Sequence, residues 1–187
     1  MKKALASGWL AAVTANTVLT TPELAEAARG FYAARETEMY EGLLGLARRY
    51  LKEGAAGEGL PFWEARSAEA ASNAPEADRE AVEAAWRRLR EAPSLHVRRG
   101  PDVAVAPRPA VGGQTIVLEP RLVRGPDDAG VRFVHDVDVV AIVELAPHVE
   151  QVPALYEAVV ARSGPTDLSA FVTALATALA RGWLAFR

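Results

Sequence analysis

Residues 153–186 read PALYEAVVARSGPTDLSAFVTALATALARGWLAF, and this stretch predicts the fold of the C-terminal half of the chain. Ser163-Gly164-Pro165 interrupts a helical pattern, and Thr166-Asp167 supplies the side chains that start a second helix. The apolar residues of that second helix share one face, and Gly182 follows its last turn. Trp183 to Phe186 then favour a strand. Helix, tight break, helix and strand follow one another in winged-helix and helix-turn-helix units.

The N-terminal half carries a different pattern, in which apolar residues recur at helical spacing. A short helix is expected over Leu5 to Val18, and Thr20-Thr21-Pro22-Glu23 predicts the start of a long amphipathic helix. Three glycines between Gly54 and Gly59 favour a loop there, because glycine weakens a helix. Pro75 to Glu91 predicts one more helix. We therefore expect a small helical bundle.

After Pro93 the sequence pattern changes to short valine-rich runs separated by prolines. Prolines 101, 107, 109, 120 and 126 and the pair Gly112-Gly113 disfavour helices. The strands expected are 95–97, 103–105, 115–118 and 131–134. With a boundary near Ser94, the sequence predicts an α+β protein: a helical domain over 1–94 and a strand plus winged-helix-like domain over 95–187.

Composition narrows the class of protein. Half of the 187 residues are hydrophobic, 24% are charged and the formal net charge is -3, which is typical of a chain that can bury a core. There is no cysteine, which excludes disulfides and thiolate chemistry and favours a cytoplasmic location. One alternative stays open: Lys2-Lys3 followed by Ala4 to Ala15 resembles a short, processed signal peptide.

The segment from Arg132 to Asp138 places an imidazole and two carboxylates close together. His135, Asp136 and Asp138 are groups that ligate a metal or move a proton, so a small metal-dependent enzyme is one hypothesis. In an extended strand, however, His135 and Asp136 point to opposite faces. The alternative is that this pair closes a hairpin or caps the apolar run that follows. No nucleophile elbow or phosphate-binding loop occurs, and we assign no catalytic residue.

A second hypothesis is a winged-helix transcriptional regulator that binds DNA. Binding to phosphates needs positive charge, yet from residue 131 to 187 four arginines (132, 162, 181, 187) face six acids (136, 138, 144, 150, 157, 167), a net of -2. The helix that would read bases has no arginine before Arg181. Nucleic acid is therefore not the expected partner.

A resemblance to a known family rests on the order of the parts and on a few short patterns. The residues that carry it are Leu118-Glu119-Pro120, Arg132-Phe133, Asp136-Val137-Asp138-Val139-Val140 and the final helix from Leu168 to Arg181. In these the chain resembles the partner proteins of multinuclear iron-dependent oxidative enzymes in ribosomal peptide natural-product pathways, of the methanobactin partner type. The C-terminal unit is similar in outline to peptide-recognition elements of the PQQ-pathway chaperone type. His135 departs from the aromatic residue or aspartate expected there.

The resemblance implies a function in which this chain binds but does not catalyse. It implies a heterodimer with an iron-dependent oxidative enzyme, a precursor peptide whose leader is recognised here, and no cofactor in this chain because the iron belongs to the other subunit. A peptide that adds to a sheet edge is then expected to use Arg132 for a carboxylate. The other expected peptide-binding residues are Phe133, Val134 and His135 beside the docked strand, with Phe171 and Leu175 as its floor.

Overall fold

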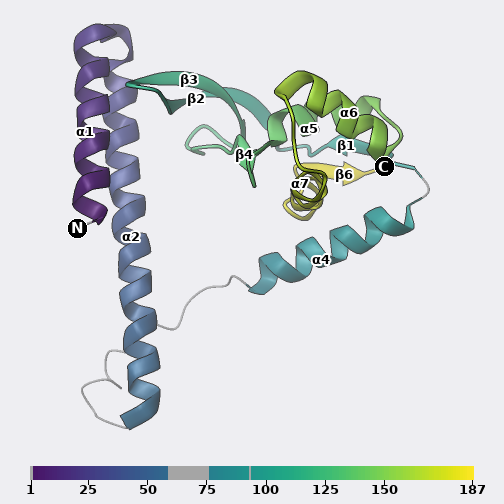
Figure 1. Ribbon diagram of the computed structural model, residues 1–187, viewed down its shortest axis with the longest axis horizontal. Coiled ribbons are helices and arrows are strands. Elements are labelled where there is room, and N and C mark those ends of the chain that lie inside the picture. Colours follow the sequence, from purple (N-terminus) through teal and green to yellow (C-terminus); the bar gives the residue numbers. More distant parts are fainter. Residues whose placement is uncertain (1, 59–75, 93) are drawn as a thin grey trace. The chain divides into compact units, whose positions relative to one another are not determined.

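The computed structural model describes residues 2–58, 76–92 and 94–187. The chain divides into two compact units, each described by itself: Met1–Asn73 with Pro109–Leu118, and Ala74–Arg108 with Glu119–Arg187. Helices and small antiparallel sheets make the protein α+β, which confirms the predicted fold class (Figure 1). Within the described residues, every helix is either too short or too polar to traverse a lipid bilayer.

The first unit is built on two long helices that lie side by side. Helix α1 (Lys2–Thr20) is followed by a single 3-10 turn, η1 (Pro22–Leu24), and by α2 (Ala25–Glu58) (Figure 1). Both helices were predicted, but α2 continues through Gly54, where we expected a loop. Glycine costs a helix about 1 kcal/mol relative to alanine, and Ala55-Ala56, the best helix formers, partly offset that cost.

The tip of a β-hairpin completes the first unit. Strands β2 (Ala104–Gly112) and β3 (Thr115–Val123) are joined by a two-residue turn in which Gly113 has a φ of +69°. Ile116 of this tip is buried together with Val13 of α1 and Ala28 of α2. The strands were expected near these places, although they run through Pro107, Pro109 and Pro120 instead of stopping at them.

The second unit surrounds one larger core. Its helices are α4 (Glu76–Glu91), α5 (Val139–Leu145), the short η3 (Ala146–His148), α6 (Val152–Ser163) and α7 (Leu168–Ala180), and its outer sheet pairs β1 (Val97–Arg99) with β6 (Leu184–Phe186). The ring of Phe171 is fully buried and meets the Tyr156 ring edge-on at 5.3 Å. Burying a side chain of this size contributes about 1.5–3 kcal/mol.

The break between α6 and α7 has the predicted chemistry. Gly164 ends α6 with a φ of +94°, and the Asp167 carboxylate accepts the Ala170 N–H at 2.9 Å to cap α7. The Tyr156 hydroxyl donates to the Thr166 carbonyl at 2.8 Å and holds the turn. Gly182 then ends α7 with a φ of +66°. The predicted order of helix, break, helix and strand is confirmed.

The division of the chain differs from the boundary expected near Ser94. Helix α4 belongs to the second unit because it packs along α7 and places Leu89 against that core. Residues 109–118 belong instead to the first unit, because Ile116 is buried there. Both differences come from contacts between residues far apart in sequence, which local patterns do not indicate.

Candidate peptide-binding site

The segment singled out by its imidazole and carboxylates forms a minimal β-hairpin. Strands β4 (Phe133–Val134) and β5 (Val137–Asp138) pair antiparallel, with Phe133 opposite Asp138. His135 and Asp136 make the turn with φ values of 50° and 64°, and both side chains are exposed. Two successive positive φ angles are those of a type I′ turn. The interpretation that this pair closes a hairpin is therefore confirmed.

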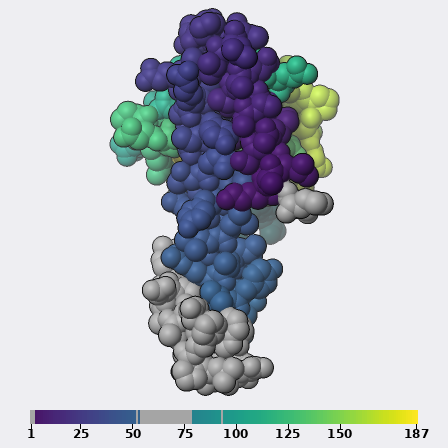
Figure 2. Space-filling model, turned by 90° about the vertical axis from the view of Figure 1, so that its left-hand side faces the viewer, coloured from purple at the N-terminus to yellow at the C-terminus, as the bar shows by residue number. Residues whose placement is uncertain are grey.

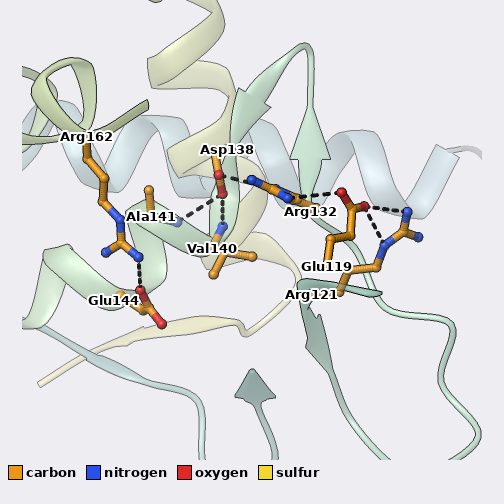
Figure 3. A network of polar contacts seen from close by, with 8 residues as sticks. All are labelled: Glu119, Arg121, Arg132, Asp138, Val140, Ala141, Glu144 and Arg162. Atoms are coloured by element: carbon orange, nitrogen blue, oxygen red, sulfur yellow. Dashed lines mark hydrogen bonds and ion pairs between the residues drawn. The ribbon is translucent and has the colours of Figure 1, made fainter. Parts of the chain in front are cut away.

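Arg132 lies at the centre of an ion-pair network (Figure 3). Its Nη1 donates to Glu119 Oε2 at 3.0 Å, and its Nε lies 3.5 Å from Asp138 Oδ2. Arg121 Nη2 donates to the other oxygen of Glu119 at 2.8 Å. The Arg132 guanidinium also lies over the Phe133 ring, 5.0 Å from its centre. Arg132 thus already has two carboxylates of its own chain as partners.

Asp138 has two tasks in the same network. Its Oδ1 accepts the N–H groups of Val140 at 3.0 Å and Ala141 at 3.1 Å, so it caps the start of α5, while Oδ2 faces Arg132 (Figure 3). A second pair, between Arg162 and Glu144, links α6 to α5. Capping by aspartate stabilises a helix by about 1 kcal/mol. Asp138 thus both caps α5 and pairs with Arg132, and these two contacts account for its position.

Histidine and acidic side chains are the potential metal ligands in the part of the chain that the structure describes. No group of three or more histidine, aspartate or glutamate side chains there is arranged to hold a metal ion. Two of the three histidines, His96 and His148, do line one small cleft of about 100 Å³, together with Glu150. Their sequence positions gave no sign of this proximity.

The six predicted peptide-binding residues divide between surface and core. Phe133 is 52% exposed, His135 is exposed, and Val134 and Arg132 are half-buried. Phe171 and Leu175 have no exposed surface and are packed in the centre of the second unit. In this structure they support the surface from beneath and offer no contact area to a ligand.

Helix α7, the counterpart of a DNA-reading helix, is covered on both sides. The core takes one side, and α4 packs along another. Its exposed residues are Leu168 and Ser169, both in the first turn. A recognition helix must present several side chains to a DNA groove. This arrangement gives the regulator hypothesis no support.

The arginines of the central strands are also engaged inside the chain. The Arg108 guanidinium donates to the carbonyls of Gly125, Pro126 and Asp128 and so closes the loop after β3. The Asp128 carboxylate accepts the backbone N–H groups of Gly130 and Arg124, and these bonds hold its pKa below the ordinary value of 3.8. Arg108 and Asp128 therefore both hold the loop that follows β3.

An unpaired strand edge occurs at β6. Gly100 N donates to Trp183 O and Arg187 N donates to His96 O, both at 2.9 Å. Together with the register of the two strands, these bonds show which residues of β6 turn their backbone groups towards β1. In an antiparallel pair every second residue turns its N–H and C=O away from the partner strand. Those residues here are Leu184 and Phe186. Their outward groups bond to no other described residue, and of the two residues Phe186 is half-buried while Leu184 is 1% exposed.

This edge borders an apolar groove of about 490 Å³ between α4 and β6. On the helix side the groove is lined by Ala81, Ala84 and Ala85, whose small side chains leave the space open. Arg88 is the charged side chain among the described lining residues, and its guanidinium lies 4.5 Å from the centre of the Phe186 ring. Strand edge, apolar floor and one cation together suit an extended peptide.

Comparisons with protein-family models, curated proteins and solved structures found no match. The β6 site was not among the predicted residues, although the strand at 183–186 was expected. The sequence feature that points to this groove is the row of alanines on one face of α4. It indicates a groove only when α4 is known to lie beside β6.

Proposed function

We propose that this chain is a non-catalytic partner subunit that binds the leader of a precursor peptide as an added β-strand on β6. In this proposal the chain is cytoplasmic and forms a heterodimer with an iron-dependent oxidative enzyme, which supplies the iron and modifies the peptide. The observation that carries the proposal is the unpaired edge of β6 beside the groove lined by α4.

An added strand would use groups that the second unit already presents. The outward N–H and C=O groups of Phe186, which is half-buried, bond to the peptide backbone, whereas Leu184 is 1% exposed and lies beneath the surface. Alternate peptide side chains enter the groove over Ala84, where apolar groups lose contact with water. A peptide carboxylate at the end of the groove meets Arg88. Affinity comes from the backbone bonds and specificity from the groove.

Strand β2 is a poorer template for an added strand. It contains Pro107 and Pro109, and proline has no N–H to donate. Prolines on an edge strand are one of the devices by which proteins prevent unwanted strand pairing. Strand β6 contains no proline, so each of its residues retains an N–H.

Assignment of the chemistry to the other subunit rests on the family resemblance. It agrees with the roles found for the polar cluster at 132–138. There Arg132 and Asp138 hold a hairpin and start a helix, and His135 and Asp136 form a turn. None of these residues needs a reaction to explain its place.

The test is recovery of bound polypeptides from the native lysate on the tagged full chain, with mass spectrometry and a metal assay on the same eluate. An Ala84→Trp variant fills the groove, and Ala161→Trp, at an exposed position on α6, is the matched control. We expect a short precursor peptide and an iron-containing oxidase with the unmodified chain. Ala84→Trp should lower peptide recovery about tenfold or more, while Ala161→Trp leaves it unchanged. Recovery of DNA alone, or equal peptide recovery with both variants, would contradict the proposal.

A further inference from the structure

Positive charge is concentrated in one short segment of the chain. Residues 87–99 contain five arginines (87, 88, 90, 98 and 99) and one acid, Glu91, which gives a net of +4 in a chain whose formal net charge is -3. Helix α2 (blue in Figure 2) shows the contrast, because its 34 residues carry six acids and five bases. A local excess of one sign of charge attracts a partner of the opposite sign.

Two of these arginines lie beside the C-terminal end of β6. Arg88 comes from α4, and its guanidinium lies 4.5 Å from the centre of the Phe186 ring. Arg98 comes from β1 and is the register partner of Ala185. Ala185 and Phe186 both line the groove between α4 and β6. This end of the groove therefore has one cation from the helix and one from the neighbouring strand beside it.

Both side chains are available to a ligand. Arg88 and Arg98 are exposed, and neither pairs with an acid among the residues that the structure describes. Arg132 and Arg162, by contrast, are held by acids of their own chain. A guanidinium that lies over an aromatic ring keeps its in-plane N–H groups for the two oxygens of a carboxylate. Carboxylates are thus the groups that Arg88 and Arg98 are suited to bind.

The pleat of β6 assigns the two arginines to opposite faces of the strand. Successive side chains of a strand point to opposite faces, and Arg88 lies over the ring of Phe186 on one of them. Residues paired in register share a face, so Arg98 lies on the face of Ala185. A strand added to β6 continues the same alternation. Its residue beside Phe186 therefore points to the side of Arg88, and its residue beside Ala185 points to the side of Arg98.

Arg98 lies one strand away from such a peptide, and the small side chain of Ala185 makes the contact feasible. Neighbouring strands lie about 4.8 Å apart, so the Cα atoms of Arg98 and of the added residue would be about 10 Å apart. Arginine and glutamate side chains together are long enough to meet across this distance. On that face the methyl group of Ala185 lies between them.

We propose that the strand bound at β6 is an acidic peptide with two adjacent acidic residues, one for Arg88 and one for Arg98. This inference rests on the proposed function and names the peptide chemistry that the groove selects. Nucleic acid is the poorer fit, because its phosphates bind best to a continuous line of cations. The described lining of the groove is mainly alanine and leucine around a single arginine.

Selection from a random peptide library on the immobilised full chain tests the inference. Enriched peptides are resynthesised, and their Kd is measured by fluorescence anisotropy. We expect the enriched sequences to share two adjacent acids, and Arg88→Gln and Arg98→Gln should each raise the Kd about threefold to tenfold. Arg90→Gln is the matched control, because it removes the same charge from an exposed position on the opposite side of α4 from Arg88. It should leave the Kd unchanged.

Charge reversal separates direct contact from a general effect of positive charge. The Arg98→Glu chain should bind one lysine-substituted peptide more tightly than the unmodified chain does, namely the peptide in which lysine replaces the acid that meets Arg98. Lysine at the other acid should give this gain with Arg88→Glu instead. Equal behaviour of the two substituted peptides with both variants would overturn the assignment of one acid to each arginine.

The outcomes also separate this inference from the proposed function. Enriched peptides that lack adjacent acids but lose binding with Ala84→Trp would overturn the acidic pair and leave the groove as the binding site. If no enriched peptide depends on Ala84, the proposed function fails as well. A short labelled DNA duplex that competes with the acidic peptide, and that loses binding with Arg88→Gln and Arg98→Gln, would assign both arginines to phosphates and overturn the inference.

Discussion

The hydroxyl of Thr17 on α1 accepts the backbone N–H of Ile116 at the hairpin tip, at 2.7 Å and with no exposure to solvent. The same hydroxyl donates to the Val13 carbonyl at 2.8 Å. One side chain thus satisfies a buried amide that comes from a point ninety-nine residues further along the chain.

Thr17→Val should destabilise the first unit by about 1–3 kcal/mol, because the shape is kept while the buried Ile116 N–H loses its acceptor. Urea unfolding and the exchange rate of the Ile116 amide measure the effect. Thr20→Val is the matched control: Thr20 is exposed and bonds only to Asn16 of its own helix, so a change within about 0.5 kcal/mol is expected. Equal stability of both variants would show that this hydroxyl does not hold the tip.

The hairpin at 133–138 offers a gain in stability. Replacing His135 by asparagine and Asp136 by glycine should raise the free energy of unfolding by about 0.5–1 kcal/mol, because Asn-Gly suits two positive φ angles better than His-Asp. Thermal unfolding checks the prediction. A loss of stability, accompanied by the loss of a bound metal ion, would instead favour the metal-enzyme hypothesis.

Asp138 combines a cap and an ion pair, and two substitutions separate them. Asp138→Ala should cost about 1–2 kcal/mol through the lost cap of α5. Asp138→Ser keeps a capping oxygen but no charge for Arg132, and it should cost less. Amide exchange at Val140 reports the cap directly. If serine is as damaging as alanine, the contact with Arg132 is the larger contribution.

Arg132→Glu now has a different expected result from the one its sequence position alone would give. If Arg132 were a surface residue that only bound a peptide, its charge could be reversed without loss of stability. In the structure the new carboxylate would lie between Glu119 and Asp138, so we expect the free energy of unfolding to fall by about 1–3 kcal/mol. Denaturant unfolding of this variant beside Arg98→Glu, an exposed position, makes the comparison.

The loop from Arg124 to Gly130 should depend on pH through Asp128. Its pKa is lowered in the folded chain, so its contribution to stability is present above the ordinary value of 3.8 and is lost as pH falls through the lower, folded value. The Gly130 amide should then exchange faster in acid than at neutral pH after correction for intrinsic rates. Asp128→Asn should abolish that difference, and a difference that persists would assign it to another group.

Local chemistry explains which parts of the fold could be predicted. The break at Gly164 and the cap at Asp167 depend on neighbours in sequence, and both are confirmed. The placement of α4 on α7 and the bond from Ile116 to Thr17 join distant segments, which periodicity does not indicate. For the site, the sequence indicated strand 183–186 but not the groove beside it. From the sequence, Arg132 was expected to bind a peptide carboxylate. Its ion pair with Glu119 was not expected, because the two residues are thirteen positions apart.

Amide hydrogen exchange at Phe186, compared between the free chain and its complex with the recovered precursor peptide, tests the central claim most directly. We expect this amide to exchange slowly only in the complex, because it donates to the backbone of the added strand. The Ala185 amide, which already faces β1, should change little and is the internal control. A bound peptide that leaves Phe186 unprotected, or that protects a different strand, would contradict the assignment of β6 as the binding edge.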